Sequence, residues 1–207
     1  LDSGRSNTAL TSSSGSLTNT SLWVDYIYLD TDERRRFAQV SHEYLIEQLQ
    51  FTGEESVSST SKTATLNFNH PVKELVWVHV NTTPGTKFQY VDNKSGSGDD
   101  NAVLKLNGHD RFAKRDGDYF KNVQRYQHHS GAKALLGDSA SPIYCYSFAL
   151  QPEEHQPSGT CNFSRIDNAR LTQGAGFTDA GGNPLALNVY AVNYNVLRIM
   201  SGMGGLA

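Results

Sequence analysis

Short runs in which apolar and polar residues alternate, separated by turn residues, constrain the fold of this chain more than any other feature. In the clearest run, Ala64, Leu66 and Phe68 alternate with threonine and asparagine, which is typical of a strand with one buried face. The same criteria predict strands at 21–29, 42–51, 62–69, 74–81, 102–107, 142–150, 159–172 and 185–200.

Two intervening segments are predicted to be helical. Asp30 and Glu33 have the spacing of a capping box, which predicts a helix over 31–40. Phe37 and Val40 of this helix are expected to face the core. The second helix, over 116–127, is indicated by apolar residues at spacings of four and three, namely Tyr119, Val123 and Tyr126.

This order of elements predicts an all-β fold. Strands without regular strand–helix alternation favour a two-sheet sandwich with short helical inserts, and an eight-stranded jelly roll is one of several sandwiches that the strand count allows. Residues 1–20 are rich in serine, threonine and glycine and are predicted to be a flexible linker. Residues 21–207 are predicted to form a single domain. Because the chain begins at Leu1 and not at methionine, we expect it to be a piece of a longer polypeptide.

Composition excludes several classes of protein. With 37% hydrophobic and 19% charged residues, the chain is predicted to be neither disordered nor a membrane protein. No apolar run approaches the roughly 20 residues of a membrane-spanning helix, and no secretory signal is recognised. The formal net charge of −3 argues against nucleic acid as a partner, because duplex binding requires a basic surface.

Searches for catalytic motifs find none. Glycine-rich nucleotide loops are missing from the sequence, and the segment 137–141 fails as a nucleophile elbow because Ser141 stands where glycine is required. A catalytic triad dispersed among the histidines and acids stays open, but no residue is singled out. The sequence therefore predicts no enzyme and no catalytic or cofactor-binding residue.

Metal-binding motifs are also not predicted. His42 and Glu43 begin a zinc-protease motif, but Ile46 occupies the position of the second histidine. The neighbouring pair His128-His129 is interpreted as a surface pair at a helix end, because adjacent side chains point in different directions and chelate poorly. The acidic pair 153–154 is interpreted as solvated carboxylates in a turn.

Five blocks of sequence carry a resemblance to a known family: 24–38 (VDYIYLDTDERRRFA), 70–77 (HPVKELVW), 143–150 (IYCYSFAL), 156–165 (QPSGTCNFSR) and 195–207 (NVLRIMSGMGGLA). In this order they resemble the major capsid proteins of large nucleocytoplasmic DNA viruses, the iridoviruses above all. The block 156–165 is the most specific. The resemblance covers the chain from about Leu22 to its end.

The resemblance implies a function and partners. The family's subunit carries two jelly rolls in tandem, and three subunits form a pseudo-hexagonal capsomer of an icosahedral shell. This chain resembles the second jelly roll only. The implied partners are the first jelly roll of the same polypeptide, two further copies in a homotrimer, neighbouring capsomers and, as further candidates, minor capsid proteins. The implied location is the virion, with assembly in the host cytoplasm, and no cofactor is implied.

The implied jelly-roll fold allows a prediction about the two cysteines. Cys145 and Cys161 lie on consecutive predicted strands, which in a jelly roll belong to opposite sheets about 10 Å apart. This distance exceeds the span of a disulfide between Cα atoms, so both are predicted to be free thiols.

Two other functions remain as alternatives. Jelly rolls also serve as glycan-binding modules, which exposed aromatic side chains in a loop would favour. A cupin-type enzyme would require clustered ligands, for which His79 is the only starting point. Against these, the polar loops 82–101 and 107–118 are expected to be the assembly surface. Arg111 and Lys114 are the candidate interface residues.

Overall fold

The computed structural model describes residues 20–57, 61–81, 90, 101–131, 143–174 and 185–206. The predicted linker lies outside these residues except for Thr20, as does most of loop 82–101. The chain divides into a larger unit, Glu47–Asn195, and a smaller unit made of Leu1–Ile46 and Val196–Ala207. Among the described residues, no helix has the length and apolar character needed to span a membrane.

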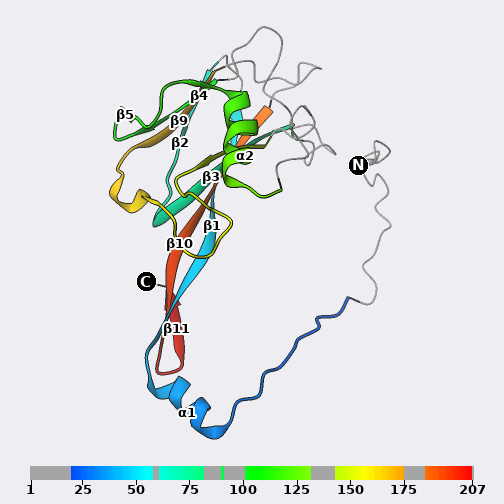
Figure 1. Cartoon of the computed structure of the whole chain (residues 1–207), viewed down its shortest axis with the longest axis vertical. Helices are drawn as coiled ribbons and strands as arrows, with labels where there is room; N and C mark the ends of the chain where they lie inside the picture. Colours follow the sequence, from blue (N-terminus) through cyan, green and yellow to red (C-terminus); the bar gives the residue numbers. More distant parts are fainter. Residues whose placement is uncertain are drawn as a thin grey trace. The chain divides into compact units, whose positions relative to one another are not determined.

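The described strands form two antiparallel sheets. The six-stranded sheet has the order β1-β10-β3-β7, with β11 added to β10 and β8 added to β3. Its strands are β1 (His42–Val57), β3 (Pro71–Asn81), β7 (Ile143–Ser147), β8 (Cys161–Asn162), β10 (Leu185–Met200) and β11 (Met203–Leu206). Figure 1 shows β11 folded back as a hairpin on the end of β10.

The five-stranded sheet lies in the larger unit. Its order is β2-β9-β4-β5, with β6 pairing β4. The strands are β2 (Ser61–Thr65), β4 (Asn101–Leu106), β5 (His109–Asp110), β6 (Arg115–Asp116) and β9 (Ala169–Gly174). In Figure 1, β2, β9 and β4 run side by side, in agreement with their pairing.

The hydrophobic core of the larger unit is built from both sheets. Leu75 and Trp77 of β3 belong to it together with Leu104 of β4 and Leu171 of β9, and all four are at most 1% exposed. The Trp77 ring stacks on Tyr144, with centroids 5.8 Å apart. The predicted inward face of 62–69 is confirmed, because Ala64, Leu66 and Phe68 are all buried. The predicted all-β class with short helices is confirmed.

Two of the predicted strands differ from the structure. The segment 21–29 contains no strand, and its large apolar side chains are exposed, Trp23 and Tyr28 each at 91%. The run 159–172 is interrupted by a 3₁₀ helix, η3 (Phe163–Arg165), which separates β8 from β9. The Asn162 side chain accepts a hydrogen bond from the Ser164 N–H, and this cap turns the chain out of the strand.

The first predicted helix is confirmed as α1 (Thr31–Gln39), and the Asp30 carboxylate accepts a 2.8 Å hydrogen bond from the Glu33 N–H. The prediction that Phe37 and Val40 face a core is wrong. They are 44% and 47% exposed, and no residue of α1 is buried. The Phe37 ring lies 4.9 Å from the His42 ring and lines a surface pocket together with Leu29, so it stays at the surface.

The second predicted helix is present over nearly its predicted range, because the backbone is helical from Gly117 to His128, but it turns differently. A π-helical turn, η1 (Tyr119–Val123), leads into α2 (Gln124–His128). Because the Gln124 N–H bonds to the Tyr119 carbonyl, five residues back, the face that packs inward is rotated. Phe120 is fully buried, whereas Val123 and Tyr126 of the predicted face are 40% and 58% exposed.

The two cysteines are free, as predicted, but the predicted reason is wrong. Both strands pair with β3 in the same sheet, Cys145 opposite Val76 and Cys161 opposite Val72. They remain apart because four residues along a strand span about 13 Å, beyond disulfide reach. The chain loops out after β7 and returns to the same edge of β3, which strand spacing alone does not reveal.

Candidate functional site

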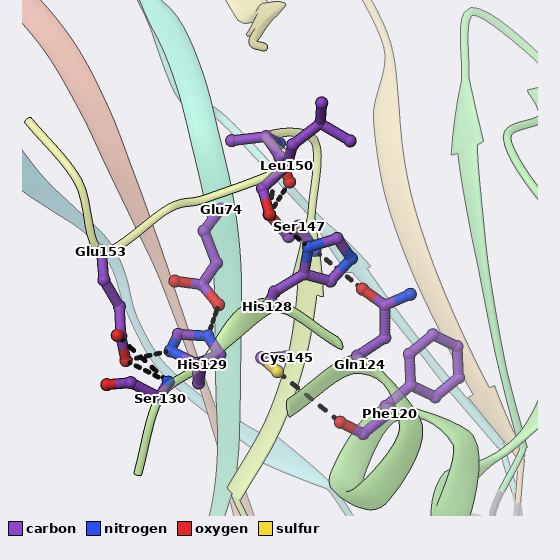
Figure 2. Close-up of polar contacts among 11 residues, drawn as sticks. Glu74, Phe120, Gln124, His128, His129, Ser130, Cys145, Ser147, Leu150 and Glu153 are labelled. Atoms are coloured by element: carbon purple, nitrogen blue, oxygen red, sulfur yellow. Dashed lines mark hydrogen bonds and ion pairs between the residues drawn. The ribbon is translucent and has the colours of Figure 1, made fainter. Parts of the chain in front are cut away.

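A carboxyl group is buried within the larger unit. Glu74 lies on β3 between β10 and β7, directly opposite Val192 and Ser147, and is only 5% exposed. Burying such a group is unfavourable unless it is paired. Its Oε1 lies 2.5 Å from Nε2 of His129, which provides that partner (Figure 2).

The position of His129 follows from the end of α2. The helix ends at His128, and the backbone of His129 becomes extended while its N–H still donates to the Arg125 carbonyl at 2.9 Å. The two neighbouring histidines therefore point apart, as predicted (Figure 2). His128 Nδ1 donates to the Leu150 carbonyl at 3.0 Å, whereas His129 turns inward to Glu74. The pair lies at a helix end as predicted, but the prediction of a surface pair is wrong for His129, whose side chain is 25% exposed.

A second carboxylate contacts the other ring nitrogen of His129. Glu153 lies in the loop after β7, and its Oε1 is 3.1 Å from Nδ1 of His129. Both of its oxygens also accept the Ser130 N–H at 3.1 Å. The prediction that the pair 153–154 is simply solvated is therefore incomplete, because Glu153 ties its loop to the segment after α2 although its side chain is 43% exposed.

The electrostatics of the site favour a protonated imidazole. The hydrogen bond to Glu74 raises the pKa of His129, against the opposing effect of burial, and Glu153 acts in the same direction. The hydrogen bonds from Ser130 lower the pKa of Glu153. Both carboxylates thus stabilise the protonated form of the ring between them.

A thiol completes the cluster. Cys145 lies on β7 beside Glu74 and is 3% exposed, and its Sγ donates to the Phe120 carbonyl at 3.6 Å. Burial raises the pKa of this thiol, so it is a poor nucleophile. Donor atoms of Glu74, His129 and Cys145 lie within 4.8 Å of one another, and among the described residues this is the group able to hold a metal ion.

Sequence reasoning did not find this cluster. Its members come from β3, β7 and the segment after α2, so no local spacing joins them. One signal was available: Glu74 opens the apolar run Leu75–Val78, and acids in such runs are rarely buried without a partner.

The residue proposed for a cupin-type site lies elsewhere. His79 is fully buried in β3, with Nε2 3.0 Å from the Gln173 side-chain oxygen and its ring edge-on to Tyr144. It does not belong to the donor group found among the described residues, so nothing there supports a cupin-type centre. His42 lies on a strand, which is incompatible with the zinc-protease helix.

The candidate interface residues lie on the connection between β5 and β6. Arg111 and Lys114 are both exposed, and the Arg111 N–H donates to the Leu104 carbonyl at 2.8 Å, which fixes the connection to β4. The two side chains are available for a partner, and their role in assembly remains a prediction.

Comparison with known proteins identifies the family. Residues 33–205 match the family described as large eukaryotic DNA virus major capsid protein. A major capsid protein of Pyramimonas orientalis virus is 53% identical over 224 residues, covering 100% of this chain and 53% of that protein. The major capsid protein of Paramecium bursaria Chlorella virus 1 is 46% identical over 238 residues, covering 90% of this chain and 53% of that protein. The chain therefore spans about half the length of these relatives.

A solved structure agrees with the sequence match. A chain in the quasi-atomic model of the PBCV-1 virus capsid superposes with a TM-score of 0.71 at 41% identity, covering 88% of this chain and 55% of that one. The predicted jelly-roll sandwich is confirmed by this similarity, and the glycan-binding alternative finds no support among these relatives. The chain belongs to the family of major capsid proteins of large eukaryotic DNA viruses.

Proposed function

We propose that this chain is the C-terminal jelly roll of a shell protein that carries two, and that it works by assembly and not by catalysis. The family match and the coverage of about half of each relative support this assignment. The proposed assembly is a homotrimer that contacts neighbouring capsomers and minor capsid proteins in the virion, after assembly in the host cytoplasm. It requires no nucleic acid and no cofactor.

The observation that carries this proposal is the exposed segment 20–29. Its apolar run is rich in aromatic and β-branched residues and is interrupted only by Asp25, which is typical of a strand buried on both faces, yet Trp23, Ile27 and Tyr28 are 87–91% exposed. A soluble protein rarely exposes so large a contiguous apolar patch unless a partner covers it. The part of the chain that matches the family model is 33–205, so the segment lies before it, and the alignment with the Pyramimonas orientalis virus protein includes the segment. We infer that 21–29 is a strand of the preceding jelly roll, which explains why it has a strand's sequence and pairs with no strand among the residues that the structure describes.

The same substitutions in two contexts test this inference. In the full-length parent protein, Trp23→Ser with Tyr28→Ser should lower the unfolding midpoint clearly, because two side chains that the first jelly roll buries would be lost. In the 207-residue chain alone the double variant should change the free energy of unfolding by no more than about 0.5 kcal/mol, because both side chains are exposed. Equal effects in the two contexts contradict the assignment.

The exposed connection between β5 and β6 is the proposed contact surface. Arg111 and Lys114 present two positive charges there. Reversing both to glutamate in the full-length parent should weaken trimers in sedimentation velocity experiments, most strongly at low salt, because charges at the edge of an interface are screened. Arg170→Glu, at an exposed position on β9, is the matched control. If both charge reversals leave the trimer unchanged, this surface is not the contact.

A further inference from the structure

The buried cluster beneath the end of α2 has the composition of a metal site. We propose that Glu74, His129 and Cys145 bind one zinc ion. Zinc prefers nitrogen and sulfur ligands together with carboxylate oxygens, and three protein ligands with one open position are a common arrangement. The three donor atoms lie within 4.8 Å of one another, from three segments that are distant in the sequence.

Only small movements would convert the present geometry into a zinc site. With zinc–ligand bonds of about 2.0–2.3 Å, the donor atoms of a tetrahedral site lie roughly 3.3–3.8 Å apart. Glu74 Oε1 and His129 Nε2 are now 2.5 Å apart, so they would separate by about 1 Å as zinc replaces the proton between them. The Cys145 thiol would give up its proton to solvent and bind as the thiolate.

The imidazole already has the outer contact that zinc-bound histidines have. When Nε2 binds a metal, Nδ1–H is usually held by a carboxylate or carbonyl, which fixes the orientation of the ring. Glu153 lies 3.1 Å from Nδ1 and is itself fixed by the Ser130 N–H (Figure 2). An arrangement of carboxylate, histidine and zinc would therefore form without a change of partner at Nδ1.

The proposed site lies beside a surface cleft. A cleft of about 230 Å³ adjoins His129 and is lined by residues that include Ser130, Leu150 and Glu153. Of the three proposed ligands only His129 lines this cleft, whereas Glu74 and Cys145 are at least 95% buried. Zinc would thus join β3, β7 and the segment after α2 at one point.

Cobalt binding is the direct test, because tetrahedral Co²⁺ with a thiolate ligand gives intense visible bands and a near-ultraviolet charge-transfer band. The purified 207-residue chain, stripped with a chelator, should bind one Co²⁺ per chain with both signals, and Zn²⁺ should displace it. Cys145→Ser should abolish the charge-transfer band, and Glu74→Gln and His129→Gln should each weaken binding at least about tenfold. Glu153→Gln, at the outer contact, should weaken it by roughly 10- to 100-fold.

Neighbouring residues provide matched controls. Cys161→Ser removes the other thiol, and His128→Gln removes the adjacent histidine, which points to Leu150. Both controls should bind Co²⁺ like the unmodified chain. A charge-transfer band that persists in Cys145→Ser, or that is lost in Cys161→Ser, overturns the proposal.

A measurement on the unmodified chain removes the dependence on how the variants fold. X-ray absorption at the zinc edge of the zinc-loaded protein should show one sulfur at about 2.3 Å and nitrogen or oxygen ligands at about 2.0 Å. A first shell without sulfur, or failure of the chain to retain one zinc ion on gel filtration, also refutes the site.

Discussion

Replacing Phe120 by alanine tests the π-helical turn that determines the core-facing side of the second helix. Phe120 is fully buried and packs against Trp77, Phe112 and Tyr119, with ring centroids 5.2–5.4 Å apart. Truncating a buried phenylalanine to alanine costs about 3–5 kcal/mol through lost burial and the cavity that remains. With a urea m value of about 2–3 kcal/mol/M for a chain of this size, the midpoint of unfolding should fall by about 1–2.5 M.

Tyr126→Ala is the matched control, because an uninterrupted helix would place Tyr126 on the buried face. Its side chain is 58% exposed, so its loss should change the free energy of unfolding by less than about 0.5 kcal/mol. Both variants would be followed by circular dichroism in urea, with equal m values as the check that the unfolded states are comparable. A large effect of Tyr126→Ala together with a small effect of Phe120→Ala would show that the helix packs in the other register.

Three further predictions follow from particular contacts. Gly159→Ala should lower the free energy of unfolding, measured in urea, by about 1–3 kcal/mol. Gly159 has a φ of +151°, and a Cβ there would lie 2.6 Å from the Phe148 carbonyl oxygen. Gly131→Ala is the control and should leave stability unchanged, because nothing lies within 4 Å of its Cβ position. Glu47→Ala should lower the free energy of unfolding by about 1–3 kcal/mol, because it leaves the buried Lys73 ammonium without the carboxylate now 2.7 Å away. Glu43→Ala removes the ion pair with the exposed Arg198 and should lower it by at most about 1 kcal/mol. Equal losses in the two variants would contradict this prediction. Thiol titration of the denatured, unreduced chain should find both Cys145 and Cys161, and an intramolecular bridge seen by mass spectrometry would contradict the same-sheet arrangement.

Local patterns predicted the elements that local interactions determine. The alternation around Leu66 specifies one buried face, and the Asp30 cap begins α1 where the capping box indicates. The second helix shows the limit of periodicity. There Phe120 packs on Trp77, a residue of β3, and this tertiary contact accompanies a π-turn that helical spacing does not reveal.

The candidate site could not be predicted from the sequence for a different reason. Glu74, His129 and Cys145 meet only after β3 and β7 have paired and α2 has ended beside them. In the sequence, Glu74 is an acid at the start of an apolar run, His129 is one of two adjacent histidines, and Cys145 is an isolated cysteine. The strand predicted at 21–29 is a related case, because the pairing partner that we propose for it belongs to a part of the protein outside this chain.

Intact mass spectrometry of the shell protein from purified virions tests the central proposal most directly. The alignment with the Pyramimonas orientalis virus protein covers all of this chain but only 53% of that protein's length. We therefore expect a single polypeptide of about twice 22.8 kDa whose C-terminal half contains this sequence. A shell component of 22.8 kDa, or virions whose shell lacks this sequence, would contradict the account.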